Sequence, residues 1–260
     1  MNMNGLLGIS RSGMNSLQKN LDNVANNIAN VNTNGYQTQT THFKELINNA
    51  VSTEEVYFSG NAAQYGWSVG SSATTGTSFG QGVLTASSQP LDMAIQGTGF
   101  FGVRNGNNEL LLTRAGNFQL DAEKGLVTSD GYPVAMTTMV PANQWPNAQN
   151  IQIDSAGRVM TQQNGQAVLL GQLTLYNPTN MNDLVPVGSQ LFQTQNAQLT
   201  SSQADPTAFG TINQHYLEGS NVDLAGSMTE LLTTQRAYAL NTKAMQTTDD
   251  MLAVVNRFTN

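Results

Sequence analysis

Two short glycine motifs contain the residue types that could perform chemistry in this chain. Residues 97–102 fit GxGxxG, whose glycines let a dinucleotide pyrophosphate approach the N-terminus of a helix. Residues 66–70 fit GxSxG, which holds a serine nucleophile, here Ser68, between a strand and a helix. No helical pattern follows either motif, because residues 103–108 are typical of a strand end with a hairpin turn and residues 71–76 of a loop. We interpret the first motif as a glycine-kinked β segment.

The titratable residues are too dispersed to predict a metal or acid–base site. The chain has 2 histidines, His42 and His215, far apart in the sequence, and no cysteine, so neither a local metal-ligand pair nor a thiolate site is present. The paired acids at 54–55 and 249–250 are adjacent residues, which do not share a helix face. We predict no metal, no cofactor and no enzymatic activity. A serine hydrolase that uses Ser68 and His215 is kept as an alternative.

The composition is polar but almost uncharged. Charged residues make up 10% of the chain, against about 25% in an average soluble domain. Asn, Gln, Ser and Thr together make up 99 of the 260 residues. The formal net charge of −7, with dispersed Lys and Arg, leaves no basic stripe for a phosphate backbone, so no nucleic-acid partner is expected. Neither a membrane-spanning segment nor an ordinary signal peptide is visible.

The N-terminal segment predicts a long helix from about Asn4 to Asn32. Its apolar residues recur by alternating threes and fours, which is a heptad seam, and they are Leu7, Met14, Leu17, Leu21, Val24, Ile28 and Val31. The other positions are mostly Asn, Gln and Lys. Since Asn is a poor helix former, this helix needs a partner. The Asn34–Gly35 pair is expected to end the helical region and turn the chain.

The C-terminal segment predicts a second long helix. Ser220 to Asp223 fits a capping box. Apolar residues follow at seven-residue intervals with one companion, and they are Leu224, Met228, Leu231, Tyr238, Met245 and Leu252. Either the two helices close one intrachain core, or they pack against other chains. Their lack of interleaved Glu and Lys favours the second, because little charge would have to be desolvated.

The middle of the chain predicts a β domain. Short apolar runs alternate with turn pairs such as Asn105–Gly106 and Asp130–Gly131, as in an antiparallel sandwich or barrel. The expected fold class is α+β, with terminal helices that pair as a coiled-coil-like domain and a central antiparallel β domain. The expected boundaries are 1–35 for the first helix, 36–80 for an extended connector, 81–215 for the β domain and 216–260 for the second helix.

Four stretches resemble the bacterial flagellar rod and hook protein family, and together they span nearly the whole chain. They are residues 21–36, with Asn26, Asn27, Asn30, Asn34, Gly35 and Tyr36, then residues 91–101, 113–118 and 218–252. The resemblance implies a structural protein whose terminal helices form the coiled-coil-like inner layers of a helical tube. The connector would lie outside those layers and the β domain at the outer surface.

The resemblance also implies partners and a location. The partners would be further copies of this chain, other rod and hook subunits, and the flagellar type III export apparatus. Export would need no cleaved signal, and the protein would reside in the basal body, in the periplasm or cell-wall region. Chain length and the long connector favour a subunit of the distal rod that transmits motor torque. A proximal rod or hook subunit of the family, and a secreted β-domain adhesin outside it, are the alternatives.

Overall fold

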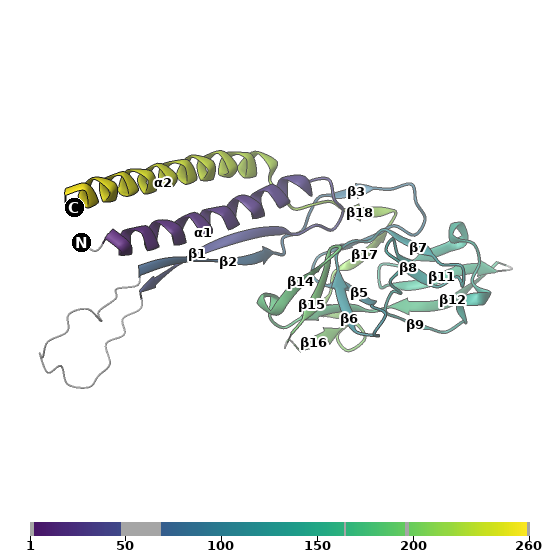
Figure 1. Ribbon diagram of the computed structural model, residues 1–260. Helices are drawn as coiled ribbons and strands as arrows, with labels where there is room; N and C mark the ends of the chain where they lie inside the picture. The colour runs from purple at the N-terminus through teal and green to yellow at the C-terminus, as the bar shows by residue number, and fades with distance from the viewer. Residues whose placement is uncertain (1–2, 48–68, 164, 196–197, 259–260) are drawn as a thin grey trace, which may run out of the picture. The chain divides into compact units, whose positions relative to one another are not determined.

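The computed structural model describes residues 3–47, 69–163, 165–195 and 198–258. Helix α1 (Met3–Ala29) begins the described chain and helix α2 (Leu224–Phe258) ends it, with antiparallel β structure between them (Figure 1). The α+β class expected from the sequence is confirmed. The chain divides into two compact units. Unit 1 comprises residues 1–29, 39–76 and 223–260, and unit 2 comprises residues 30–38 and 77–222.

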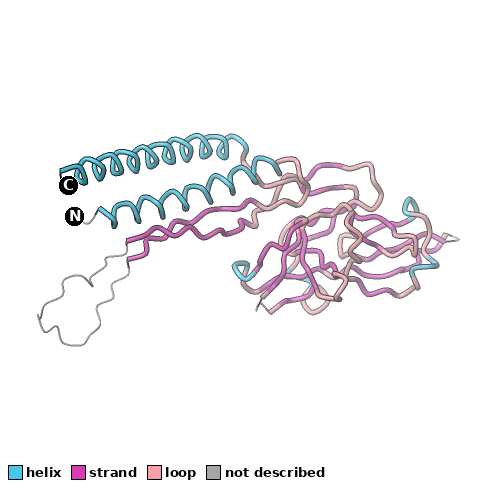
Figure 2. The backbone as a smooth tube through the Cα atoms, viewed as in Figure 1, coloured by secondary structure: helices cyan, strands magenta, loops and turns pink. Residues whose placement is uncertain are grey.

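Unit 1 contains the two helices and a β hairpin. The helices run antiparallel, since Ser10 of α1 meets Asn241 of α2 whereas Asn20 meets Thr234. Strands β1 (Thr38–Ile47) and β2 (Val69–Ser78) form a two-stranded sheet in the range expected to be an extended connector. Figure 2 shows this hairpin running alongside α1.

The start of α2 differs from the capping box expected at Ser220. The helix begins at Leu224, and the Asp223 carboxylate accepts a hydrogen bond from the Ala225 backbone N–H at 3.1 Å. Asp223 is therefore the N-cap, and the prediction of Ser220 was wrong by three residues. The Ser220 hydroxyl instead accepts a bond from the Val222 N–H at 3.3 Å, which supports the turn before the helix.

Unit 2 is built from short strands joined by tight turns. Their bounds are β3 (Leu84–Ala86), β4 (Met93–Gln96), β5 (Phe100–Arg104), β6 (Leu110–Thr113), β7 (Phe118–Leu120), β8 (Leu126–Thr128), β9 (Met136–Thr138), β10 (Ile151–Ile153), β11 (Arg158–Gln163), β12 (Gln166–Leu173), β13 (Leu175–Pro178), β14 (Leu184–Gly188), β15 (Leu191–Thr194), β16 (Leu199–Ser201), β17 (Thr211–Gln214) and β18 (Tyr216–Glu218). The apolar runs around Met93, Phe100, Leu110 and Ile151 fall on these strands, as expected.

Two larger sheets make up most of unit 2. One has the strand order β14-β15-β6-β5-β13-β16, and the other has the order β10-β11-β12-β9. Ribbons β7-β8, β17-β4 and β18-β3 complete it. The last two ribbons pair the end of the unit with its beginning, so residues 211–218 close the unit against residues 84–96.

The core of unit 2 is apolar and consists of two clusters, of which the first is the larger. It includes Met93, Ile95 and Val103, which have no exposed surface, and Trp145, which is 1% exposed. Burial of side chains of this size stabilises a domain by roughly 1.5–3 kcal/mol each. Phe79, Phe100 and Phe192 form a second cluster with edge-to-face ring contacts.

Candidate functional site

The buried face of α1 is made of polar side chains. Ser16, Asn20, Asn23 and Asn27 are 3%, 5%, 8% and 4% exposed. Spacings of four, three and four residues place them on one stripe of the helix. The predicted apolar seam flanks this stripe. Val24 is buried, whereas Met14, Leu17, Leu21 and Ile28 are half-buried.

Asn20 and Asn241 connect α1 to α2. The Asn20 side-chain amide donates to the Glu230 carboxylate and to the Thr234 hydroxyl, both at 3.1 Å. Near the other end of the pair, the Asn241 amide donates to the Ser10 carbonyl at 3.1 Å. Because buried amides must be hydrogen-bonded, these contacts require a defined alignment of the helices.

Two further amides connect α1 to the β1–β2 hairpin. The Asn27 amide donates to the Gln39 carbonyl at 2.8 Å, and its oxygen accepts from the Gln39 N–H at 2.9 Å. This reciprocal pair satisfies both backbone groups of one strand residue, as a neighbouring strand would. Asn23 donates to Thr41 at 2.7 Å and to Thr75 at 3.2 Å. One stripe of α1 therefore serves both neighbours through hydrogen bonds.

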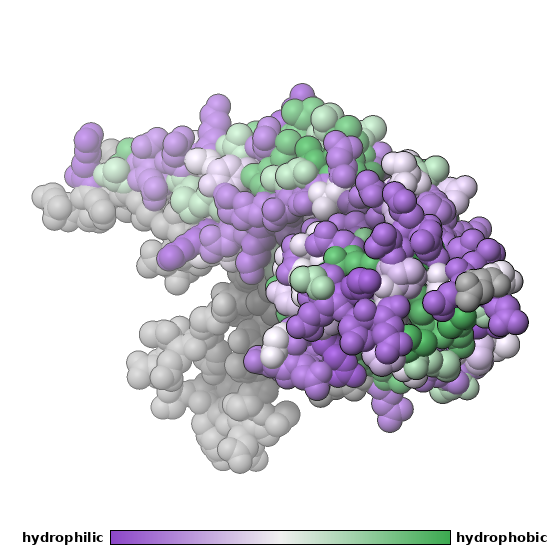
Figure 3. Space-filling view, turned by 90° about the vertical axis from the view of Figure 1, so that its right-hand side faces the viewer, coloured by the Kyte–Doolittle hydropathy of each residue, from purple (hydrophilic) through white to green (hydrophobic). Residues whose placement is uncertain are grey.

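The face of α2 turned away from α1 is rich in apolar side chains. Large hydrophobic residues on this helix are exposed, at 38% for Leu224, 49% for Met228, 56% for Leu232, 69% for Leu240, 63% for Met251 and 50% for Val254. Leu232, Leu240, Met251 and Val254 lie within an arc of about 100° on the side opposite Ser227 and Thr234, and we call these four residues the apolar face of α2. In Figure 3, hydrophobic side chains gather at the top of the view, over α2. An apolar set this large along one helix is typical of a surface that packs against another molecule.

The predicted seam residues of α2 divide between exposed and half-buried positions. Leu224 and Met228, near the start of the helix, are exposed, whereas Leu231, Tyr238 and Met245 are half-buried. Leu7 and Leu252 lie within α1 and α2, and their side chains are outside the described part of the structure. Val31 is half-buried in unit 2, just beyond the end of α1.

In unit 2, residues of three family motifs meet at a buried junction. Gly35 has a φ of +71°, and a Cβ there would lie 2.3 Å from the Ala115 backbone nitrogen. Its N–H donates to the Glu218 carbonyl at 2.8 Å. A glycine is required at this point both by the backbone conformation and by the close approach of residues 114 and 115.

A buried ion pair lies at this junction. An Arg114 guanidinium nitrogen is 3.2 Å from a Glu218 carboxylate oxygen, and the two side chains are 7% and 0% exposed. Arg114 also donates to the Gly97 carbonyl at 3.0 Å, and the other Glu218 oxygen accepts from the Gly82 N–H at 3.1 Å. Burial lowers the pKa of Arg114, while the Glu218 charge opposes that shift. Each charge is thus satisfied by its partner and by the backbone.

The Asn221 side chain forms a second group of hydrogen bonds at this junction. Its side-chain oxygen accepts bonds from the Thr38 N–H at 2.7 Å and hydroxyl at 2.6 Å. Its amide donates to the Ser78 and Gly80 carbonyls at 2.8 and 2.9 Å. One side chain therefore holds together three segments that are far apart in the sequence.

The remaining motif residues lie around the turn after α1. The Asn30 side chain accepts a hydrogen bond from the Thr33 hydroxyl at 3.1 Å. Tyr36 is half-buried, and burial raises the pKa of its phenol. Asn26 and Asn34 are exposed. These residues shape the turn or lie at its surface.

The motifs with possible chemistry are placed as follows. Gly97 and Gly99 have φ values of +111° and +124°, and strand β5 follows them, in keeping with a glycine-kinked β segment. Ser68 lies outside the described residues. His215 is exposed in the turn between β17 and β18, and its ring contacts the Gln89 carbonyl at 3.1 Å. The geometry at Gly97 is not that of a dinucleotide site.

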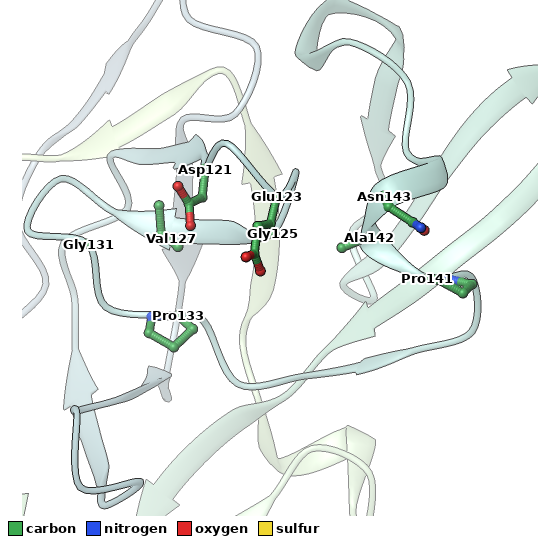
Figure 4. A pocket seen from close by; sticks show the side chains of 9 residues that line it. All are labelled: Asp121, Glu123, Gly125, Val127, Gly131, Pro133, Pro141, Ala142 and Asn143. Carbon is green, nitrogen blue, oxygen red and sulfur yellow. The ribbon is translucent and has the colours of Figure 1, made fainter.

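One open pocket of about 580 Å³ lies in unit 2 and is shown in Figure 4. Asp121 and Glu123 are its acidic residues, and the rest of its lining is Gly125, Val127, Gly131, Pro133, Pro141, Ala142 and Asn143. Among the described residues, no group of three or more His, Cys, Asp or Glu side chains is arranged to hold a metal. Within the same ranges, neither helix is long and apolar enough to cross a membrane.

Comparisons with known proteins agree with this layout. The family model described as flagella basal body rod protein matches residues 7–37, the flagellar hook protein FlgE/F/G D1 domain matches residues 94–161, and the flagellar basal body rod FlgEFG protein C-terminal model matches residues 213–258. The chain is 36% identical to the flagellar basal-body rod protein FlgG of Agrobacterium fabrum, over 96% of this chain and 98% of that protein. The chain belongs to the FlgG family. The FlgG of Bacillus subtilis is 34% identical, over 93% of this chain and 94% of that protein.

The matches confirm the family resemblance and the assignment to the distal rod made from the sequence. The flagellar hook-basal body complex protein FlhP of Bacillus subtilis is also similar, at 29% identity over 94% of this chain. Since FlgG relatives align along almost their full length, they favour a structural rod subunit over the adhesin and hydrolase alternatives.

Sequence reasoning missed three features of this site. It identified neither the inward amide stripe of α1 nor the pairing of Arg114 with Glu218, and it did not single out Asn221. All three depend on contacts between residues that are far apart in the chain. The available signal was that Asn20, Asn23 and Asn27 recur at helical spacing, which indicates a shared face.

Proposed function

We propose that this chain polymerises with further copies of itself into the helical tube of the distal rod, which transmits motor torque to the hook. The subunits are related by a heterologous contact that does not close, so they build a tube of many copies rather than a ring. Other rod and hook subunits continue the tube above and below.

The observation that carries the proposal is the apolar face of α2. Leu232 and Leu240 are more than half exposed, and water contact with such side chains is unfavourable unless another surface covers them. We assign that surface to a second copy of the chain. The terminal helices of neighbouring copies would pack there as coiled-coil-like layers, with Met14, Leu17, Leu21 and Ile28 contributing from the half-buried flank of α1.

The absence of net charge on α2 supports the same arrangement. Its charged residues are all exposed and their charges cancel, and they are Glu230, Arg236, Lys243, Asp249, Asp250 and Arg257. The remaining exposed positions are mainly Thr, Gln, Ala and Leu. Desolvation of neutral side chains costs much less than desolvation of ions, so several helix faces per subunit can be buried. We further propose that the protein reaches the basal body, in the periplasm or cell-wall region, through the flagellar type III export apparatus without a cleaved signal.

Electron microscopy of basal bodies from a strain that lacks this gene tests the proposal. We expect structures that stop at a short proximal rod and carry no hook, and full structures when the intact gene is restored. A complete rod without a hook would instead assign the chain to the hook. Complete hook-basal bodies in the deletion strain would refute the proposed role.

A further inference from the structure

Apolar side chains lie on both sides of α2. The side toward α1 carries Ser227 and Thr234, which are 9% and 6% exposed, and the half-buried Leu231, Tyr238 and Met245. Leu232 and Leu240 point away at 56% and 69% exposed. Rotation of α2 about its own axis would exchange one apolar set for the other, so apolar burial alone does not select the observed rotation. A more specific interaction must therefore favour it.

Hydrogen bonds from Asn20 and Asn241 supply that interaction. Asn20 donates to Glu230 and Thr234, which are one helical turn apart on the same side of α2. Two acceptors on one side define the rotation of a helix more strictly than a single contact does. At the other end, Asn241 reaches the Ser10 carbonyl, and Gly13 leaves room for it, since a Cβ there would lie 3.0 Å from the Asn241 amide nitrogen.

A rotated α2 would leave the side-chain amides of Asn20 and Asn241 without hydrogen-bond partners. A rotated α2 would remove both acceptors of Asn20 while the amide stayed against the helix pair, and an unpaired buried amide is costly. The hydrogen bonds therefore select the observed rotation within the isolated subunit. In this rotation Leu232 and Leu240 remain for another molecule to cover.

We propose that Asn20 and Asn241 are positioning residues that fix the rotation of α2, so that its apolar face is presented to a second copy of this chain. The inference rests on the proposed function, because the second copy is the neighbour in the rod. It assigns the amides a task in assembly that is separate from holding the two helices together.

Disulfide trapping can measure the rotation, because the chain has no cysteine of its own. The Thr242 hydroxyl lies 3.7 Å from the Met14 sulfur, so the pair Met14→Cys and Thr242→Cys reports the observed orientation. The pair Met14→Cys and Leu240→Cys reports the rotated one, since residue 240 lies on the opposite side of α2 from residue 242. Both pairs are placed in the full-length chain and oxidised in cells of the deletion strain.

The test variant is Asn20→Leu, and the matched control is Asn15→Leu, the same change at an exposed position of α1. With Asn20 intact, we expect the 14–242 disulfide to predominate. In Asn20→Leu, the ratio of 14–240 to 14–242 disulfide should rise at least tenfold, and the same substitution without cysteines should lose rods. An unchanged ratio, or an equal change in the control, would overturn the proposal.

A second variant keeps the test decisive if Asn20→Leu does not accumulate. Asn241→Leu removes the contact with Ser10 and should shift the disulfide ratio in the same direction, whereas no shift would count against the proposal. Failure of the intact cysteine-free gene to restore rods would contradict the proposed function itself. Normal rods from both leucine variants would contradict only the positioning role.

Discussion

Among single residues, Arg114 and Glu218 make the contact most sensitive to substitution. Replacement of Glu218 by Gln leaves a buried guanidinium without its counter-ion, and loss of one partner of a buried pair costs about 3–5 kcal/mol. We expect a loss of that size in the free energy of unfolding of unit 2, measured by urea denaturation.

Two controls separate this effect from a general response to lost charge. Arg158→Ala removes a pair whose arginine side chain is 53% exposed, so unfolding should change by less than about 1 kcal/mol. The double variant Arg114→Met, Glu218→Leu should recover most of the loss, because no buried charge remains. Equal losses in Glu218→Gln and Arg158→Ala would contradict the assigned importance of the buried pair.

Gly35 is the second sensitive residue. Alanine at this position would adopt a φ of +71° and place its Cβ 2.3 Å from the Ala115 nitrogen. We expect Gly35→Ala to destabilise unit 2 by at least about 2 kcal/mol, since backbone strain and steric overlap add. Thermal unfolding measures the change. Gly106→Ala is the control, because a Cβ there has open space around it, and a similar loss in that variant would refute the explanation.

Among the elements, α2 carries the prediction that bears on assembly. Leu240→Lys introduces a charge on the apolar face without disturbing the packed side of the helix, because Leu240 is 69% exposed. We expect the unfolding free energy of the subunit to change by less than about 0.5 kcal/mol, while hooked basal bodies disappear from cells. Gln119→Lys, at an exposed position of β7, should leave their number unchanged. Normal basal bodies in Leu240→Lys would contradict a packed outer face.

The elements also show what could be predicted from the sequence and what could not. Strands such as β5 and β10 and the turn at Asn105 follow from local apolar runs and turn residues, which act over a few positions. The periodicity indicated which residues of α1 share a face. From it we expected the apolar residues, and not the asparagines, to face the interior. At Asn20 the inward stripe depends on Glu230 and Thr234, more than two hundred positions away, and no local pattern carries that information.

The start of α2 shows a similar limit at one helix end. Ser220 and Asp223 both suit an N-cap, and the capping-box spacing selected the first. In the structure, the Asn221 side chain is hydrogen-bonded to Thr38, Ser78 and Gly80, and the backbone around it is not helical. These long-range contacts lie between the two locally acceptable caps, and no local pattern predicts them.

For the whole molecule, the ribbons β17-β4 and β18-β3 determine how much of the chain unit 2 needs in order to fold. Strands β17 and β18 pair with β4 and β3, and Ile212 is 2% exposed. We expect a chain that ends after Val222 to keep a cooperative unfolding transition of unit 2, and a chain that ends after Gly210 to lose it. Trp145 is 1% exposed, so its fluorescence in a Trp67→Phe background reports the transition. Cooperative unfolding of the shorter chain would contradict the closure of the unit by residues 211–218.

The hydrogen bonds between α1 and α2 have a consequence for the timing of folding. Asn20 and Ser10 find their partners 210 to 231 positions along the chain. A polypeptide delivered residue by residue from its N-terminus presents α1 long before α2 arrives, and contacts of such high sequence separation form late. Before α2 is present, exposed amides on α1 are hydrated and associate with other chains much less readily than exposed leucines would. We therefore expect the same stripe that aligns the finished helix pair to reduce premature aggregation of α1.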